Sequence, residues 1–137
     1  MPCCIIYLVR QSIILHKSRC EVAEVVDREL KRGTLEMILL KLLSSRPMYG
    51  YELVSALEKR GGARFQLKEG TLYPVLYRLE DAGYVAAHWE TLERGVPRKY
   101  YRLTPAGTAR LQALTDEWHS FAAAVNHLLA GEEGADA

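Results

Sequence analysis

Apolar residues recur three and four positions apart after residue 34, the spacing of one buried face of an α-helix. Thr34 stands at the expected N-cap of this helix, because its hydroxyl can accept a hydrogen bond from an unpaired backbone N–H group. Ser-Ser-Arg-Pro at residues 44–47 would end the helix. The apolar stripe consists of Leu35, Ile38, Leu39, Leu42 and Leu43.

A second short helix is predicted over residues 49–60. It begins at Tyr49 or Gly50 and ends where Gly61 and Gly62 interrupt the apolar pattern. A tight turn would join it to the first helix. Its inward residues are Leu53, Val54 and Leu57.

A third helix is predicted from Glu69 to Ala82, with Gly83 at the position that favours a left-handed backbone. The inward residues of this helix are Leu72, Val75, Leu76 and Leu79. Its outward face then carries side chains that are cationic or form hydrogen bonds. These outward residues are Thr71, Tyr73, Tyr77 and Arg78.

After Gly83 the period of the apolar residues changes to two, which indicates β-strands. Residues 84–89 and 99–103 are predicted to pair as a hairpin. The loop between them contains Arg-Gly-Val-Pro-Arg at residues 94–98, so the hairpin has a basic tip. Such a tip is also typical of an ordinary solvated loop.

The last helix is predicted from Thr104 and Pro105 to about Ala130, because threonine suits the N-cap and proline suits the first helical position. Its apolar residues alternate three and four positions apart, as in the seam of a coiled coil. This repeat predicts that two copies of the chain pair through the helix. The seam comprises Leu111, Leu114, Trp118, Phe121, Val125 and Leu128.

The expected fold is mainly α with a small β-hairpin. It consists of a winged helix-turn-helix at residues 27–104 and a dimerisation helix at residues 105–130. The acidic residues 131–137 are expected to form a flexible tail. Residues 1–26 stay unassigned, since their apolar pieces fit neither a helix nor a strand. They are either a structural extension that packs on the dimer or the product of a misplaced start at Met1.

The length of 137 residues is that of one domain with appendages. The apolar stretch from Cys3 to Val9 is far shorter than the roughly 18 residues of a bilayer span, and no signal-peptide pattern surrounds it. Cys3, Cys4 and Cys20 are an odd number of cysteines without a C-x-x-C pair, which argues against a disulfide framework and a metal site. We therefore expect a cytoplasmic protein without a cofactor.

The net charge of +1 conceals a segregation of charge along the chain. Residues 46–104 carry 10 basic and 7 acidic side chains, whereas residues 105–137 carry 1 basic and 5 acidic ones. Local fields rather than net charge steer a polyanionic ligand. The predicted winged domain is therefore the part of the chain suited to a polyanion.

The order of three helices and a hairpin predicts binding to double-stranded DNA. In a winged helix-turn-helix the third helix enters the major groove, and the hairpin loop contacts neighbouring phosphates or the minor groove. A symmetric dimer would place two such helices about 34 Å apart on one face of the duplex. The expected DNA-binding residues are Tyr51, Lys68, Glu69, Thr71, Tyr73, Tyr77, Arg78, Arg94, Arg98 and Lys99.

Residues 33–107 resemble the PadR family of transcriptional regulators. The motif at residues 98–107 and the motif at residues 70–80, which contains Thr-Leu-Tyr, are fairly specific when both are present. Each motif alone is weak evidence. The resemblance rests on Gly-Thr-Leu at 33–35, Tyr-Gly-Tyr-Glu-Leu at 49–53, Gly-Thr-Leu-Tyr-Pro-Val-Leu-Tyr-Arg-Leu-Glu at 70–80, Gly-Tyr-Val at 83–85 and Arg-Lys-Tyr-Tyr-Arg-Leu-Thr-Pro-Ala-Gly at 98–107.

This resemblance implies a homodimeric repressor that binds an inverted repeat and releases it when a small molecule or a stress signal arrives. The single C-terminal helix looks like that of the smaller PadR subgroup, some members of which stack flat aromatic effectors on a tryptophan of this helix. Trp118 stands at the matching place, with Phe121 and Val125 as further candidates for an effector site. Because Trp118 also falls on the apolar seam, the alternative is that it belongs to the dimer core.

Two other classes of protein are the alternatives. An enzyme is disfavoured, because the four histidines His16, His88, His119 and His127 have no nucleophile or carboxylate at a recognisable spacing, and the chain has no glycine-rich phosphate loop. The remaining alternative is a winged helix that contacts another protein instead of DNA. The sequence does not identify an operator, a regulated gene or an effector.

Overall fold

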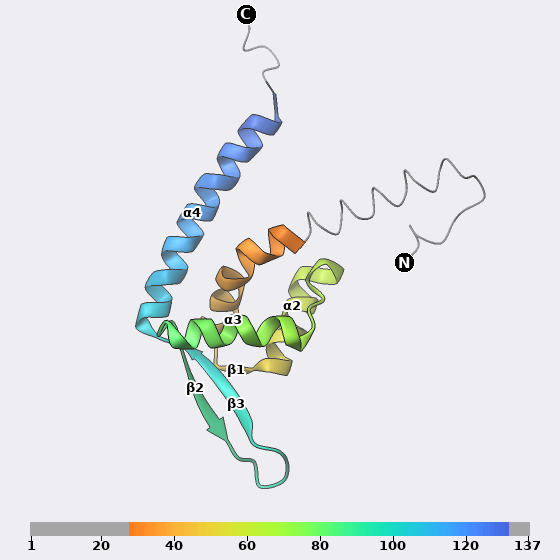
Figure 1. The fold of residues 1–137 in the computed structure, drawn as a ribbon, viewed down its shortest axis with the longest axis vertical. Coiled ribbons are helices and arrows are strands. Elements are labelled where there is room, and N and C mark those ends of the chain that lie inside the picture. The colour runs from red at the N-terminus through yellow and green to blue at the C-terminus, as the bar shows by residue number, and fades with distance from the viewer. Residues whose placement is uncertain (1–27, 132–137) are drawn as a thin grey trace, which may run out of the picture.

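The computed structural model describes residues 28–131, except for the side chain of Glu69. The expectations for residues 1–26, including all three cysteines, and for the tail beyond residue 131 lie outside the described residues. The described chain forms a body of helices with a small sheet at one end, and a long helix extends away from this body (Figure 1). The expected class, mainly α with a small antiparallel sheet, is confirmed.

The first described helix covers residues 28–43, so the expectation that Thr34 caps it is wrong. The Thr34 hydroxyl donates to the carbonyl oxygen of Leu30 at 2.8 Å, one turn earlier in the same helix. Threonine in a helix interior commonly forms this bond, so a capping residue cannot be recognised from its type alone. The predicted end is confirmed: the helix stops at residue 43, and the Ser44 hydroxyl donates to the carbonyl oxygen of Lys41 at 2.6 Å.

Helix α2 (Gly50–Gly61), the 3₁₀ turn η2 (Gly62–Phe65) and helix α3 (Glu69–Asp81) follow in order, as the apolar spacing predicted for the two α-helices. Gly83 has φ +79°, the left-handed conformation expected after α3. Gly50 is needed for close packing, because a Cβ atom there would collide with the ring of Tyr73. This contact sets α2 directly against α3.

Strands β2 (Val85–Glu90) and β3 (Arg98–Leu103) form the predicted antiparallel hairpin, which we call the wing. The structure adds strand β1 (Met48–Tyr49), which pairs with the outer edge of β3 and gives the sheet order β1-β3-β2. The sequence did not predict β1, because two residues are too few to display a period of two. Its pairing places Tyr49 opposite Tyr100.

Helix α4 (Pro105–Leu129) begins as predicted. The Thr104 side chain accepts a hydrogen bond from the Gly107 backbone N–H at 3.0 Å, and its hydroxyl donates to the Gly83 carbonyl oxygen at 2.6 Å. One threonine therefore caps α4 and ties its start to the end of α3. The C-terminal half of α4 stands clear of the other described elements (Figure 1).

One apolar core joins the three body helices to the sheet. Leu39, Leu53, Leu72 and Leu76 are fully buried, as is Tyr101 of β3. Every inward residue predicted for α3 is buried. No helix in the described part of the chain is long and apolar enough to cross a membrane.

Candidate functional site

The buried face of α3 fixes its orientation and thereby the direction of its other side chains. The four predicted outward residues lie on two flanks. Thr71 and Arg78 are seven positions apart and share one flank, whereas Tyr73 and Tyr77 are four apart and share the other. The rings of the two tyrosines stack with centroids 6.1 Å apart. They differ in exposure, since Tyr77 is half-exposed and Tyr73 leans onto Gly50 of α2.

The flank of Thr71 and Arg78 has a different environment at each end. Thr71 is exposed in the first turn of α3, next to the exposed Lys68. Arg78 lies near the C-terminal end of α3 and lines a small cavity of about 210 Å³ with Glu36 and Arg110. Arg78 is nevertheless exposed, as are Thr71 and Tyr77, so the polar face is open along most of α3. The side chain of Glu69, also expected to bind DNA, lies outside the described part.

Aromatic rings connect the start of α2 to the wing. Tyr51 is 65% exposed, and its ring stacks on that of Tyr49 at 6.3 Å. The Tyr49 ring also meets Tyr100 of β3 edge-on, and the Arg98 guanidinium lies 4.7 Å above it. The sequence singled out Tyr51 and Arg98 but missed Tyr49 and Tyr100. The alternation of Arg98, Tyr100 and Arg102 along β3 was the available signal, because alternate residues share one face of a strand.

The basic wing residues differ in what holds them. Arg94 at the tip and Arg98 are exposed. Lys99 instead faces α3, where its Nζ donates to Glu80 Oε2 at 3.1 Å and lies 5.3 Å from the ring centroids of Tyr77 and Tyr101. Desolvation by burial lowers the pKa of Lys99, but the interactions of its ammonium with Glu80 and Tyr101 together outweigh this effect, so the pKa is raised.

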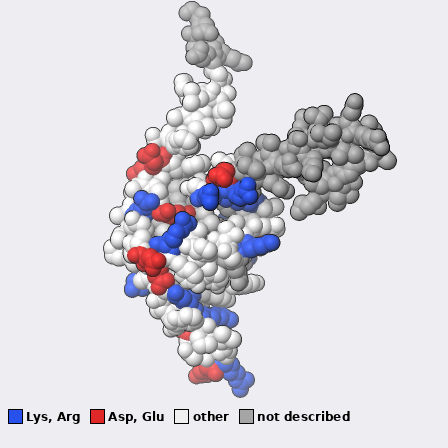
Figure 2. Space-filling view, viewed as in Figure 1, with Lys and Arg blue, Asp and Glu red and all other residues white. Residues whose placement is uncertain are grey.

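Lysine and arginine side chains are spread over the body and along the wing, mixed with acidic ones (Figure 2). The upper half of α4 carries neither sign of charge in this view. In the sequence, residues 118–131 indeed contain no Lys, Arg, Asp or Glu. A polyanion would therefore meet the body and wing rather than the end of α4.

The predicted seam of α4 divides into two parts. Leu111 and Leu114 are half-buried and pack against the core of their own chain. Phe121 is 61% exposed and Leu128 is 78% exposed, with the neighbouring Leu129 at 79%. Val125 between them is half-buried. The distal part of the seam is thus an apolar surface that no described element covers.

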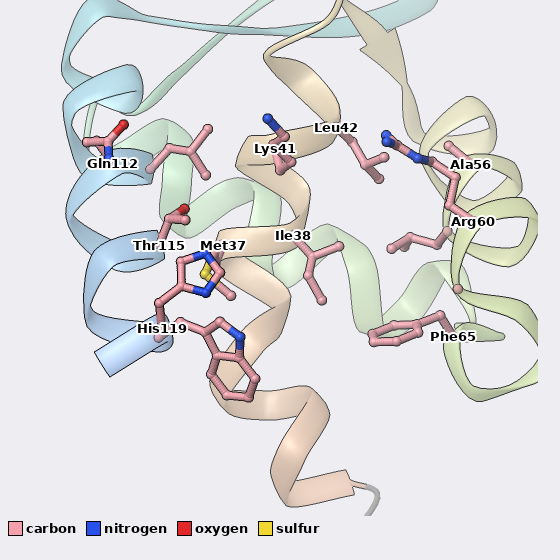
Figure 3. Close-up of a pocket in the computed structure, with 14 residues that line it drawn as sticks. Met37, Ile38, Lys41, Leu42, Ala56, Arg60, Phe65, Gln112, Thr115 and His119 are labelled. Carbon is pink, nitrogen blue, oxygen red and sulfur yellow. The ribbon is translucent and has the colours of Figure 1, made fainter. Parts of the chain in front are cut away.

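A pocket of about 440 Å³ lies between the 28–43 helix, α2, η2 and the base of α4 (Figure 3). In Figure 3, His119 of α4 and Phe65 of η2 are on opposite sides of the space, with Ile38 between them. Trp118 lines this pocket, but Phe121 and Val125 of the predicted effector site do not. The ionisable residues that line it are all basic or histidine: Lys41, Arg60 and His119.

The described residues contain no group of three His, Cys, Asp or Glu side chains that could hold a metal ion.

Residues 39–113 match the model of the transcriptional regulator PadR-like family. The transcriptional regulator Rv3488 of Mycobacterium tuberculosis is 30% identical over 105 residues, which are 77% of this chain and 92% of that protein. A crystal structure of a PadR family transcriptional regulator from Eggerthella lenta is 36% identical with a TM-score of 0.75, over 82% of this chain and 96% of that one.

The crystal structure of Bacillus subtilis PadR in complex with operator DNA is also similar. It has a TM-score of 0.54 and 26% identity, and the match covers 58% of this chain and 45% of that one. That structure contains the Bacillus subtilis protein together with operator DNA.

Proposed function

The chain belongs to the PadR-like family of transcriptional regulators, and on this basis we propose that it is a homodimeric repressor of an inverted-repeat operator. Helix α3 would read the major groove, and the wing would contact adjacent phosphates. The observation that carries the proposal is the exposed polar face of α3, with Thr71, Tyr77 and Arg78, next to a wing that contacts α3 and exposes Arg94 and Arg98.

Two kinds of contact are expected within this surface. Thr71 and Tyr77 are short or stiff side chains on the reading helix, suited to base edges and thymine methyl groups. Arg94, Arg98 and Lys68 are exposed cations suited to phosphate contacts. Tyr51 lies with Tyr49 beside Arg98 and would extend the phosphate-contacting surface to the start of α2.

The exposed distal seam of α4 supports the homodimer. Phe121, Leu128 and Leu129 would leave a large apolar area in water in a monomer, and residues 118–131 carry no charge that would oppose burial. Pairing of this helix with its copy would cover that area. The dimer would also double the phosphate contacts and set the spacing of two reading helices.

The pocket beside Trp118 supports release by a small molecule. Its volume falls within the usual range of about 300–1,000 Å³ for small-molecule sites. A ligand there would touch α4 and the 28–43 helix at once, so it could shift the angle between the dimerisation helix and the DNA-binding body. We assign Trp118 to this ligand site, with Phe121 and Val125 on the dimer side of the same helix.

The two tryptophans allow a direct test of the effector site. In a Trp89→Phe variant, Trp118 is the sole tryptophan, and a flat aromatic ligand in the pocket should quench its emission with saturation. The matched Trp118→Phe variant keeps only the wing tryptophan and should show no saturable quenching. Equal quenching in both variants would contradict an effector site at Trp118.

Hydroxyl-radical footprinting on DNA from upstream of the protein's own gene tests the repressor proposal. Two symmetric protected patches, separated by one helical turn of roughly 10 base pairs, are expected for a dimer on an inverted repeat. A single patch would contradict binding as a dimer. No protection on upstream DNA or on genomic fragments would favour the protein-contact alternative.

A further inference from the structure

We propose that Lys99 is a positioning residue that clamps the wing to the reading helix through Glu80, rather than a residue that contacts phosphate. This inference rests on the proposed DNA-binding function, since it concerns how α3 and the wing are held for that task. It changes the role that the sequence suggested for Lys99, which lies directly after the exposed Arg98.

The register of the sheet places Lys99 on the side of the wing that faces α3. Lys99 pairs with Trp89 in the hairpin, two residues before the buried Tyr101 on the same face of β3. Its neighbour Arg98 lies on the other face, above Tyr49. Adjacent cations in one strand therefore point in opposite directions and meet different partners.

The ammonium group of Lys99 interacts with other side chains of the same protein. Its Nζ donates to Glu80 Oε2 at 3.1 Å, and its side chain is 26% exposed, against 35% for Glu80. The same Nζ lies 5.3 Å from the ring centroids of Tyr77 and Tyr101, within the range of a cation–π contact. A phosphate contact would have to compete with a carboxylate and two aromatic rings.

The clamp connects three elements of the proposed reading surface: α3, the wing and the core beneath them. Glu80 and Tyr77 belong to α3, three positions apart, whereas Lys99 and Tyr101 belong to β3. Because Tyr101 is fixed in the core, Lys99 joins the half-exposed ring of Tyr77 to a rigid point. The distance between the wing and α3, and the direction of Tyr77, would therefore depend on this ion pair.

The substitution Glu80→Gln separates the two roles of Lys99, because they predict opposite signs. If Lys99 contacts phosphate, Glu80→Gln frees the ammonium and removes a negative charge near DNA, so affinity for every DNA sequence rises. If Lys99 positions the wing, Glu80→Gln weakens operator binding and leaves binding to scrambled DNA almost unchanged. The expected reduction is at most about 5-fold if one half-site responds and at most about 30-fold if both respond.

Four further variants complete the measurement by fluorescence anisotropy. Lys99→Met should weaken operator binding as Glu80→Gln does, and the double variant should bind no more weakly than either single one. Lys99→Arg should retain the pair and most of the affinity. Arg102→Met is the matched control, because it removes an exposed cation from the opposite face of β3. Tighter binding of Glu80→Gln to all DNA would overturn the proposal.

Hydrogen exchange of the β2 and β3 amides gives a readout that needs no DNA. Lys99→Met and Glu80→Gln should accelerate exchange in the wing by similar factors, without further acceleration in the double variant. If the wild-type chain does not prefer an operator, the proposed function fails. The hydrogen-exchange result still decides whether the clamp exists. Unchanged wing exchange in both single variants would overturn the clamp itself.

Discussion

The guanidinium of Arg110 on α4 donates from Nε to Glu36 Oε1 in the 28–43 helix at 2.9 Å, across 74 positions of sequence. The same guanidinium lies 5.5 Å above the ring of Tyr84. The hydrogen bond to Glu36 is the main reason that the pKa of Arg110 is raised. This contact fixes the base of the projecting helix on the body, close to the cap at Thr104.

Replacing Arg110 by methionine should lower the free energy of unfolding by at most about 1 kcal/mol, because both side chains are about one third exposed and water screens the pair. Urea denaturation measures this change. Arg32→Met is the control, since its pair with Glu29 spans 4.0 Å on an exposed helix surface and should contribute nothing measurable. Equal destabilisation of the two variants would mean that the Arg110 pair has no special role.

Substitutions in α3 and at the wing tip should affect DNA binding differently. Arg94→Ala should weaken binding to all sequences and reduce the slope of log affinity against log salt by about 1 for each phosphate that is no longer neutralised. Thr71→Ala should mainly reduce discrimination between operator and scrambled DNA, by roughly 5- to 30-fold. Anisotropy titrations at several salt concentrations separate these effects. The same pattern of weakening in both variants would contradict the division between reading and phosphate contacts.

A charge on the distal seam of α4 should disrupt the dimer without unfolding the chain. Leu128→Glu introduces the charge at a side chain that is 78% exposed in a single chain, so its effect should appear only in assembly. Ala123→Glu is the matched control, because it lies two positions from Phe121, nearly on the opposite side of the helix. Sedimentation equilibrium should find monomers for Leu128→Glu and dimers for Ala123→Glu. A dimeric Leu128→Glu would count against the seam.

The buried hydroxyl of Tyr101 forms no close hydrogen bond among the described residues, although the Lys99 ammonium interacts with it. Tyr101→Phe should therefore raise the free energy of unfolding by about 1 kcal/mol, since the desolvation of this hydroxyl is no longer required. Burial raises the pKa of Tyr101 above its ordinary value of 10.0, while Lys99 partly opposes the shift.

The direction of this pKa shift predicts how stability depends on pH. The folded state favours the neutral phenol, so Tyr101 makes its full contribution to stability below about pH 10. The wild type loses this contribution as pH rises through the raised pKa of Tyr101. Tyr101→Phe should show a smaller decrease in stability at alkaline pH. Urea midpoints measured between about pH 8 and pH 11 test this, and parallel curves for the two proteins would contradict it.

Most of the fold followed from apolar spacing, because each helix of the body buries one continuous stripe. The inward residues of α3 and the cap at Thr104 were predictable, since a single local rule decides each of them. The prediction for Thr34 was wrong because two local rules compete there: a threonine hydroxyl can cap a helix or bond back to the previous turn. The residues upstream of Thr34 decide which rule applies, and here residues 28–33 are helical.

The candidate site was less predictable, because its contacts join residues far apart in the sequence. The composition of the wing identified Arg98 and Lys99 as cations, but only the sheet register shows that they face opposite ways. Similarly, the repeat along α4 does not reveal that Leu111 and Leu114 pack on their own core while Phe121 and Leu128 stay exposed.

Binding to a specific DNA sequence through charge-dependent contacts of α3 and the wing is the property on which the proposed function depends. Fluorescence anisotropy of labelled DNA from upstream of the protein's own gene, against a scrambled duplex, measures it. We expect preferential binding that weakens by roughly 10³- to 10⁵-fold between 50 and 200 mM salt, if about 6–10 phosphates are contacted. Equal binding to both duplexes, or affinity that does not depend on salt, would contradict sequence-specific binding by these elements.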